Sequence, residues 1–333
     1  MPNLSEAIRT IRWMVRDTFR QSISTKLFWV MLSITVVCTA FAASIKVTGG
    51  VSTYEGVAYT MPQSEVDKLG GVEKVTADGV QVKNGEISLG FGAIKSKIAK
   101  SKEDSVKFIQ IWLAGVVGDS LGILLAIIWT AGFLPTFLEP QSATVLLAKG
   151  APRWSILLGK YFGVVGFVSL QALLFVLGTW LALGGATGVW DLTYWLAVPL
   201  MMANFAIFYA VSVFIAVATR STVAAAFGTL LFWVLCWVMN YTHHSIVSQP
   251  VSSLGSGAGS LLEIGYWFLP KPLDLGGLFF DSMGAAGFYG QMPEMADLKN
   301  ANKFHPEASV LASGAFAVVT LGAACYEFQQ TDY

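Results

Sequence analysis

Charged residues are scarce in this sequence. Asp, Glu, Lys and Arg make up 13% of the 333 residues, about half of their share in soluble domains. Because 54% of the residues are hydrophobic, the composition excludes a protein whose whole surface meets water. Basic and acidic residues balance at 21 each. There is therefore no overall positive charge that would indicate a nucleic-acid partner.

Cysteine and histidine are also rare, with three of each. Each cysteine lies far from the others in an apolar stretch, at Cys38, Cys236 and Cys325. This placement favours small buried side chains over disulfides or metal ligands. His243 and His244 are adjacent, so a helix would point them apart, and His305 stands alone. We expect neither a metal centre nor a Ser-His-Asp site.

Long apolar runs dominate the rest of the chain. A bilayer core about 30 Å thick needs roughly 20 apolar residues per spanning helix. Six windows come close to this length, and we expect an all-α polytopic membrane protein with six transmembrane helices. The windows are Leu27–Ile45, Trp112–Leu138, Tyr161–Leu183, Leu192–Thr219, Val223–Tyr241 and Ala308–Tyr326.

Basic residues in the short connections predict the orientation, because such residues resist translocation. They occur in residues 1–26, in the loop 139–160 and at Arg220, whereas the loop 184–191 has no Lys or Arg. We expect the basic connections in the cytosol, with both termini cytosolic, including the tail 327–333. The first window and its lead exceed the dimensions of a signal peptide.

The lead, residues 1–26, predicts an amphipathic helix. Its apolar stripe consists of Leu4, Ile8, Ile11, Val15 and Phe19. The adjacent basic stripe consists of Arg9, Arg12, Arg16 and Arg20. A helix of this kind lies on the inner leaflet, with its arginines at anionic lipid headgroups. The alternative is that the segment only anchors the topology.

Residues 46–111 differ from the spans, because they hold nine lysines and no arginine. We expect a small external α+β domain here. Alternation around Asn84-Gly85 predicts a β-hairpin that turns at this dipeptide, and Ile94–Gln110 predicts a charged helix. The domain serves either as a packing cap or as a contact for a substrate or partner.

A second external region, residues 242–307, contains two short apolar runs. Leu261–Leu269 and Leu273–Met283 are separated by Pro270-Lys271-Pro272. Runs of this length predict re-entrant or interfacial helices. The alternative is a seventh span, which would move the C-terminus to the other side.

Few polar groups lie inside the spans, and those present must face protein or water. They are Asp119, Gln171 and Asn204. Asp119-Ser120 favours a helix cap over a transport-pathway role. Gln171 and Asn204 favour interhelical hydrogen bonds over substrate ligands. The sequence reveals no buried ion pair, which argues against coupling to an ion gradient.

The cytosolic loop between the second and third windows predicts a short capped helix. Glu139-Pro140 would begin it, and Lys149, Gly150 and Pro152 would end it, with charges that complement the helix dipole. Such a helix is a rigid lever, although an ordinary turn remains an alternative.

The same loop carries a family resemblance. Phe137-Leu138-Glu139-Pro140, Leu146-Leu147-Ala148-Lys149, Arg153-Trp154 and Leu157–Gly163 resemble the coupling-helix loop of type 2 ABC transporter permeases. One departure is Gly150, where the family usually has proline. The resemblance implies a permease whose loop docks on an ATPase through Glu139, Leu146, Leu147, Lys149, Arg153 and Arg220.

The sequence has no G-x-x-x-x-G-K-[ST] phosphate loop. We expect no enzymatic activity and no cofactor in this chain, with ATP and Mg²⁺ bound by separate ABC ATPase subunits. A second permease chain and the inner-membrane bilayer are the other expected partners. Two alternatives remain: an ion-coupled transporter or channel, and a membrane scaffold that binds a partner through residues 46–111. The substrate stays open.

Overall fold

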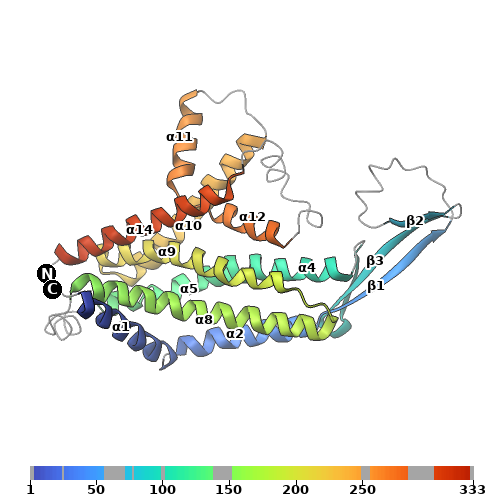
Figure 1. Ribbon diagram of the computed structural model, residues 1–333, viewed down its shortest axis with the longest axis horizontal. Coiled ribbons are helices and arrows are strands. Elements are labelled where there is room, and N and C mark those ends of the chain that lie inside the picture. Colours follow the sequence, from blue (N-terminus) through green and yellow to red (C-terminus); the bar gives the residue numbers. More distant parts are fainter. Residues whose placement is uncertain are drawn as a thin grey trace.

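The computed structural model describes most of the chain, and its described part is mainly helical. Long helices lie side by side, and a small sheet extends from one end of the bundle (Figure 1). We call this end the sheet end, and the opposite end, where α8 begins at Arg153, the Arg153 end. The described residues are 4–24, 26–55, 72–76, 79–98, 102–137, 152–248, 256–283 and 304–330.

Five helices of the described residues are long and apolar enough to cross a membrane. One is built from α4 (Lys102–Trp112), η2 (Leu113–Gly122) and α5 (Ile123–Thr130) and continues to Pro135; a short helix, α6, covers Phe133–Phe137. The others are α8 (Arg153–Thr187), η3 with α9 (Leu192–Leu196, Ala197–Thr219), α10 (Thr222–Ser248) and α14 (Pro306–Gln330). The chain is therefore a multi-pass membrane protein.

A sixth candidate span is a bent pair of helices. α1 (Leu4–Ser24) and α2 (Lys26–Ala43) meet at an angle of 68°. The sequence predicted a first span from Leu27, and α2 begins at Lys26. The fourth predicted window, Leu192–Thr219, has the same bounds as the span in the structure, whereas α8 begins at Arg153 instead of Tyr161.

α1 packs along the first half of α8, and this contact depends on glycines. A Cβ atom at Gly159 would lie 2.6 Å from Cβ of Met14, and one at Gly163 would lie 2.7 Å from Cβ of Thr18. The buried stripe of α1 therefore runs through Met14 and Thr18, and Ile8 is exposed. Ile8 of the predicted apolar stripe lies on the face that α8 leaves uncovered, so its predicted contact with acyl chains stays a prediction.

The sheet is antiparallel and is organised around one long central strand. β3 (Gly79–Leu89) pairs on one side with β1 (Lys46–Glu55) along its whole length. On its other side, β3 pairs first with β2 (Val72–Thr76) and then with β4 (Ile94–Ile98). Ile45, Val47 and Ile87 form a small core with Leu183 of α8, which attaches the sheet to the bundle.

Two predictions for this region are wrong. Asn84-Gly85 lies inside β3, where Gly49 pairs with Gly85, so no hairpin turns there. The segment predicted as one helix, Ile94–Gln110, begins with strand β4, and the described helix α4 starts at Lys102. The local turn and helix patterns are overridden because strands pair with β3 along both of its edges, and this cross-strand pairing stabilises one long strand.

The region after α10 contains two short helices. α11 (Ser256–Phe268) and α12 (Pro272–Ser282) have 13 and 11 residues, fewer than the roughly 20 needed for a span. They lie on the α10 and α14 side of the bundle, and α11 projects away from it (Figure 1). The break between them falls at Pro270-Lys271, as the proline pair predicted.

The core of the bundle surrounds α9, which contacts α8, α10 and α14. Phe205 and Tyr209 of α9 stack on each other, and Tyr209 stacks in turn on Tyr161 of α8. The Tyr161 hydroxyl donates a hydrogen bond of 2.8 Å to the Ala206 carbonyl oxygen. All three cysteines are free thiols; Cys236 is buried, and the other two are half-buried.

Candidate functional site

The Arg153 end of the bundle holds the described part of the predicted coupling region. Arg153 is in the first turn of α8, and one of its guanidinium nitrogens donates a 3.2 Å hydrogen bond to the carbonyl oxygen of Gln329 in α14. Arg220 follows α9 in the left-handed conformation and is exposed. Four coupling residues lie outside the described residues: Glu139, Leu146, Leu147 and Lys149.

α8 and α9 are antiparallel neighbours joined by residues 188–191 and η3, so the end of α9 returns to the end where α8 begins. Arg153 and Arg220 therefore share one end of the bundle, and the sheet occupies the other (Figure 1). A hydrogen bond also connects α1 to α8 near this end. Lys160 of α8, which is 2% exposed, donates it to Gln21 Oε1 of α1 over 2.7 Å. The predicted surface arginines on α1 are exposed: Arg9, Arg12, Arg16 and Arg20.

The span that contains Asp119 has an irregular middle. η2 is a π-helical segment of 10 residues, and π-helical turns in α-helices occur frequently at functional sites. The Ser120 hydroxyl donates to the Gly115 carbonyl oxygen five residues earlier. The expected helix cap at Asp119 is wrong, because the helix runs on through this residue.

Asp119 instead contacts a neighbouring helix. The Asn204 side-chain amide of α9 donates to both carboxylate oxygens of Asp119, at 2.8 and 3.0 Å. The Oδ1 atom of Asn204 is buried without a hydrogen-bond partner among the described residues. The structure thus brings together two of the three polar residues that the sequence singled out in the spans.

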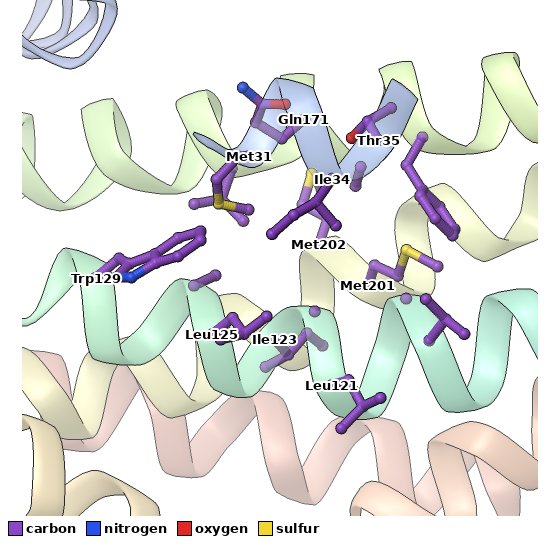
Figure 2. Close-up of a pocket in the computed structure, with 17 residues that line it drawn as sticks. Met31, Ile34, Thr35, Leu121, Ile123, Leu125, Trp129, Gln171, Met201 and Met202 are labelled. Atoms are coloured by element: carbon purple, nitrogen blue, oxygen red, sulfur yellow. The ribbon is translucent and has the colours of Figure 1, made fainter. Parts of the chain in front are cut away.

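An apolar cavity of about 210 Å³ lies beside η2. α2, η2, α5, α8 and α9 form its walls (Figure 2). The lining includes three flexible methionines, Met31, Met201 and Met202, and the indole of Trp129. No Asp, Glu, Lys or Arg is among the described residues that line it. The absence of a side chain at Gly118 lets Met201 pack closely against η2, since a Cβ at this position would lie 2.1 Å from Cε of Met201.

Gln171, the third polar residue, is one of the residues that line this cavity. Its side chain is 3% exposed, and both amide heteroatoms lack a hydrogen-bond partner among the described residues. The interhelical hydrogen bond expected for Gln171 is therefore missing from this part of the structure. A buried amide without partners is unfavourable by about 2–7 kcal/mol in an apolar surrounding, so a conformational change that gave Gln171 a hydrogen-bond partner would be stabilising.

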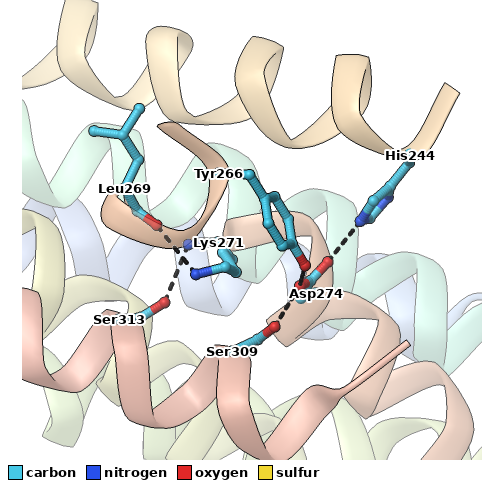
Figure 3. A network of polar contacts seen from close by, with 7 residues as sticks. All are labelled: His244, Tyr266, Leu269, Lys271, Asp274, Ser309 and Ser313. Atoms are coloured by element: carbon cyan, nitrogen blue, oxygen red, sulfur yellow. Dashed lines mark hydrogen bonds and ion pairs between the residues drawn. The ribbon is translucent and has the colours of Figure 1, made fainter. Parts of the chain in front are cut away.

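A second polar cluster joins α10, α11, α12 and α14 (Figure 3). Its centre is the buried carboxylate of Asp274, which accepts hydrogen bonds of 2.5 Å from the hydroxyls of Tyr266 and Ser309. Nε2 of His244 lies 2.8 Å from Oδ1 of Asp274. No sequence pattern indicated this contact, because His244 and Asp274 lie 30 residues apart on different helices.

Lys271, beside this cluster, is 0% exposed. Its backbone N–H donates to the Ser313 hydroxyl, and its ammonium lies over the rings of Tyr266 and Trp267 at 4.9 and 4.8 Å. Burial lowers the pKa of Lys271, although Asp274 opposes this shift. Burial alone would raise the pKa of Asp274, but hydrogen bonds, the foremost from His244, outweigh it and place the pKa below its usual value.

Sequence reasoning missed the cavity, the π-helical segment and the Asp274 cluster. The methionine content of the spans and the three glycines of residues 115–122 were the available signals for the first two. His243 and His244 do have different partners, since His243 stacks on Tyr266 at 3.7 Å and His244 contacts Asp274.

Comparison with known proteins gives one family. The family model described as "ABC-2 family transporter protein" matches residues 12–256. A search of curated proteins finds no match. The matched segment includes all five elements that form the cavity, α2, η2, α5, α8 and α9, and the loop that precedes Arg153.

Proposed function

Because this chain belongs to the ABC-2 transporter family and is a membrane permease of that family, we propose that it pairs with a second permease chain and with two separate ATPase subunits. ATP hydrolysis by those subunits drives a substrate across the cytoplasmic membrane. The ATPases dock at the Arg153 end, and both chain termini lie on that cytosolic side. This chain itself hydrolyses no ATP and holds no cofactor.

The observation that carries this proposal is the shared position of Arg153 and Arg220. Two connections that are far apart in sequence meet at one end of the bundle, so a docked subunit can push on both. Arg153 is hydrogen-bonded to the end of α14, and α1 is tethered to α8 through Lys160. Movement at this end therefore passes directly into α8, α14 and α1.

The mechanism follows from rigid helices connected at their ends. α8 is a 35-residue helix, about 52 Å long at 1.5 Å per residue, and it reaches from Arg153 to the core of the sheet. A tilt of α8 at the Arg153 end changes its packing against α2 and α9, which border the cavity. We propose that this tilt alternately closes and opens the path for substrate.

Docking is testable by cross-linking from the coupling loop. A cysteine at Lys149 is expected to capture an ATPase subunit in membranes, whereas a cysteine at Lys95, on β4 at the sheet end, is expected to capture none. The purified chain alone should not hydrolyse ATP. ATP hydrolysis by the isolated chain, or equal capture from both positions, would overturn the proposal.

The orientation has its own test with a membrane-impermeant thiol reagent. Cysteines at Arg153 and Arg220 should react only after the cells are permeabilised, and a cysteine at Lys95 should react in intact cells. All three are made in a background without Cys38, Cys236 and Cys325. Reaction of Arg153 and Arg220 from opposite sides would remove the docking surface and contradict the assignment.

A further inference from the structure

We propose that the cavity beside η2 holds the hydrocarbon chain of a lipid-like substrate that arrives sideways from the bilayer. The inference rests on the proposed transport function and specifies its substrate class. Its physical basis is the combination, in one place, of an uncharged cavity, an opening at the side of the bundle and flexible methionine walls.

The lining excludes charged ligand groups from the cavity. None of its described lining residues is Asp, Glu, Lys or Arg, and an ionised group moved into such surroundings without a partner is strongly disfavoured. Apolar groups gain from the transfer. A cavity of roughly 150 Å³ lined by aliphatic and aromatic side chains stays dry and binds benzene, so about 210 Å³ accommodates a segment of an acyl or isoprenoid chain.

The cavity is open at the side of the bundle. Four of its lining residues are exposed large hydrophobics: Ile34, Leu121, Leu125 and Met202, at 40%, 55%, 37% and 43%. They belong to candidate membrane-spanning helices, and we propose that this surface faces hydrocarbon and lies outside the contact with the second permease chain. A chain from a bilayer amphiphile can therefore enter between α2 and α5 without passing through water.

The walls suit chains that differ in shape. Met31, Met201 and Met202 approach the cavity from α2 and α9 (Figure 2), and methionine adapts to irregular apolar partners because its side chain is unbranched and flexible. Gln171 is placed in the same wall with both amide heteroatoms unpartnered among the described residues.

The test uses the complex of permease and ATPase in phosphatidylcholine vesicles with two photoactivatable probes. One is a fatty acid and the other a phosphatidylcholine, each with a diazirine in the acyl chain. Cross-links are mapped by mass spectrometry on Val117–Trp129 and compared with the exposed α14 residues Val318 and Val319. We expect at least fivefold enrichment at the cavity with one or both probes, and the responding probe tells whether the chain carries a headgroup.

Two variants on the same helix separate the cavity from the general surface. Ala172 lines the cavity, and its neighbour Leu173 is exposed outside it. Ala172→Phe should abolish the enrichment, and Leu173→Phe should leave it unchanged. Trapping the ATPase with ATP and vanadate should reduce the enrichment at least threefold, because a transported chain leaves the site.

Labelling of Val117–Trp129 that only equals the labelling of α14 would overturn the inference, and so would enrichment that survives Ala172→Phe. Enrichment that vanadate leaves unchanged would also overturn it, because it would indicate a structural lipid that stays bound. The control is the ATPase activity of the complex, measured in the same vesicles. If that activity and the ATPase association persist while labelling fails, the substrate class is wrong and the permease function stands. Loss of ATPase association contradicts the permease proposal itself.

Discussion

Asn204 donates its amide to both carboxylate oxygens of Asp119, at 2.8 and 3.0 Å, and so joins the π-helical segment of one span to the central helix of the bundle. The pair lies next to the cavity wall, since Gly118 and Met201 are lining residues. The geometry of η2, and with it the shape of the cavity, therefore depends on this contact.

The first prediction concerns this pair. Asn204→Leu removes the donor and leaves the Asp119 carboxylate in an apolar surrounding, so we expect a loss of about 1–3 kcal/mol in the free energy of unfolding. Thermal unfolding of the purified protein in detergent measures it. In the Asp119→Leu background, Asn204→Leu should cost at least about 1 kcal/mol less, because the interaction is already absent. Additive losses would show that the two residues act independently.

The second prediction concerns the contact between α1 and α8. Gly159→Ala would place Cβ 2.6 Å from Cβ of Met14 and 3.1 Å from Cα of Ile11. Because one of the contacting atoms belongs to the backbone, a side-chain rotation cannot remove this clash. We therefore expect α1 to be displaced and the free energy of unfolding to fall by about 1–3 kcal/mol. Gly185→Ala is the matched control, because it lies in the same helix with nothing within 4 Å.

Gly185→Ala should be neutral or stabilising by up to about 1 kcal/mol, since alanine has the higher helix propensity. Unfolding temperatures of both variants provide the measurement. A tolerated Gly159→Ala would indicate that α1 rests only loosely on α8.

The positions of the long helices were largely predictable, because each depends on the apolar composition of one continuous segment. The fourth window has the same bounds in sequence and structure because Asp191 caps its start, where the side chain accepts a hydrogen bond from Thr193 N, and Arg220 ends it. α8 was misjudged for the opposite reason. Arg153 and Lys160 resemble loop residues by charge, yet Lys160 is buried and held by Gln21 of another helix.

The site was less predictable because it is made from distant residues. Asp119, Gln171 and Asn204 were identified as polar groups in spans, but the pairing of Asp119 with Asn204 depends on how η2 packs against α9. Asp274 and His244 gave no local sign of their contact. The residue pattern of one segment indicates its periodicity and which residues are apolar. Which side chains meet between two helices depends on how the helices pack, and one segment does not determine this.

The third prediction concerns the four α1 arginines, whose side chains are all exposed. Changing Arg9, Arg12, Arg16 and Arg20 to Gln removes positive charge near the first span, and we expect a measurable fraction of chains to reverse their N-terminus. A cysteine at Ser5, in a background without Cys38, Cys236 and Cys325, reports the side by its reaction with an impermeant thiol reagent.

The matched control removes four lysines from the long sheet region: Lys95, Lys97, Lys102 and Lys107. Charges in long translocated loops contribute little to orientation, so Ser5→Cys should stay unreactive in intact cells. Equal effects of the two sets would contradict the assignment of α1 to the cytosolic side.

The fourth prediction concerns Asp274, whose carboxylate lies within reach of His244, Tyr266 and Ser309. Asp274→Asn leaves these groups without their charged acceptor, and because each hydrogen bond to a charged group contributes about 1.5–3 kcal/mol, we expect a loss of at least about 3 kcal/mol. Tyr266→Phe removes one hydrogen bond and should cost only about 1–2 kcal/mol. The measured quantity is the free energy of unfolding at pH 7.

The pH dependence follows from the lowered pKa of Asp274. A carboxyl group whose pKa is lower in the folded state than its unfolded value of about 3.9 contributes stability above that pH, and this contribution is lost as the pH falls through the folded pKa. The difference between wild type and Asp274→Asn should therefore stay constant from about pH 8 to 5 and shrink below about pH 4. A difference that already disappears when the pH is lowered to about 6 would show that the pKa of Asp274 is not lowered in the folded protein.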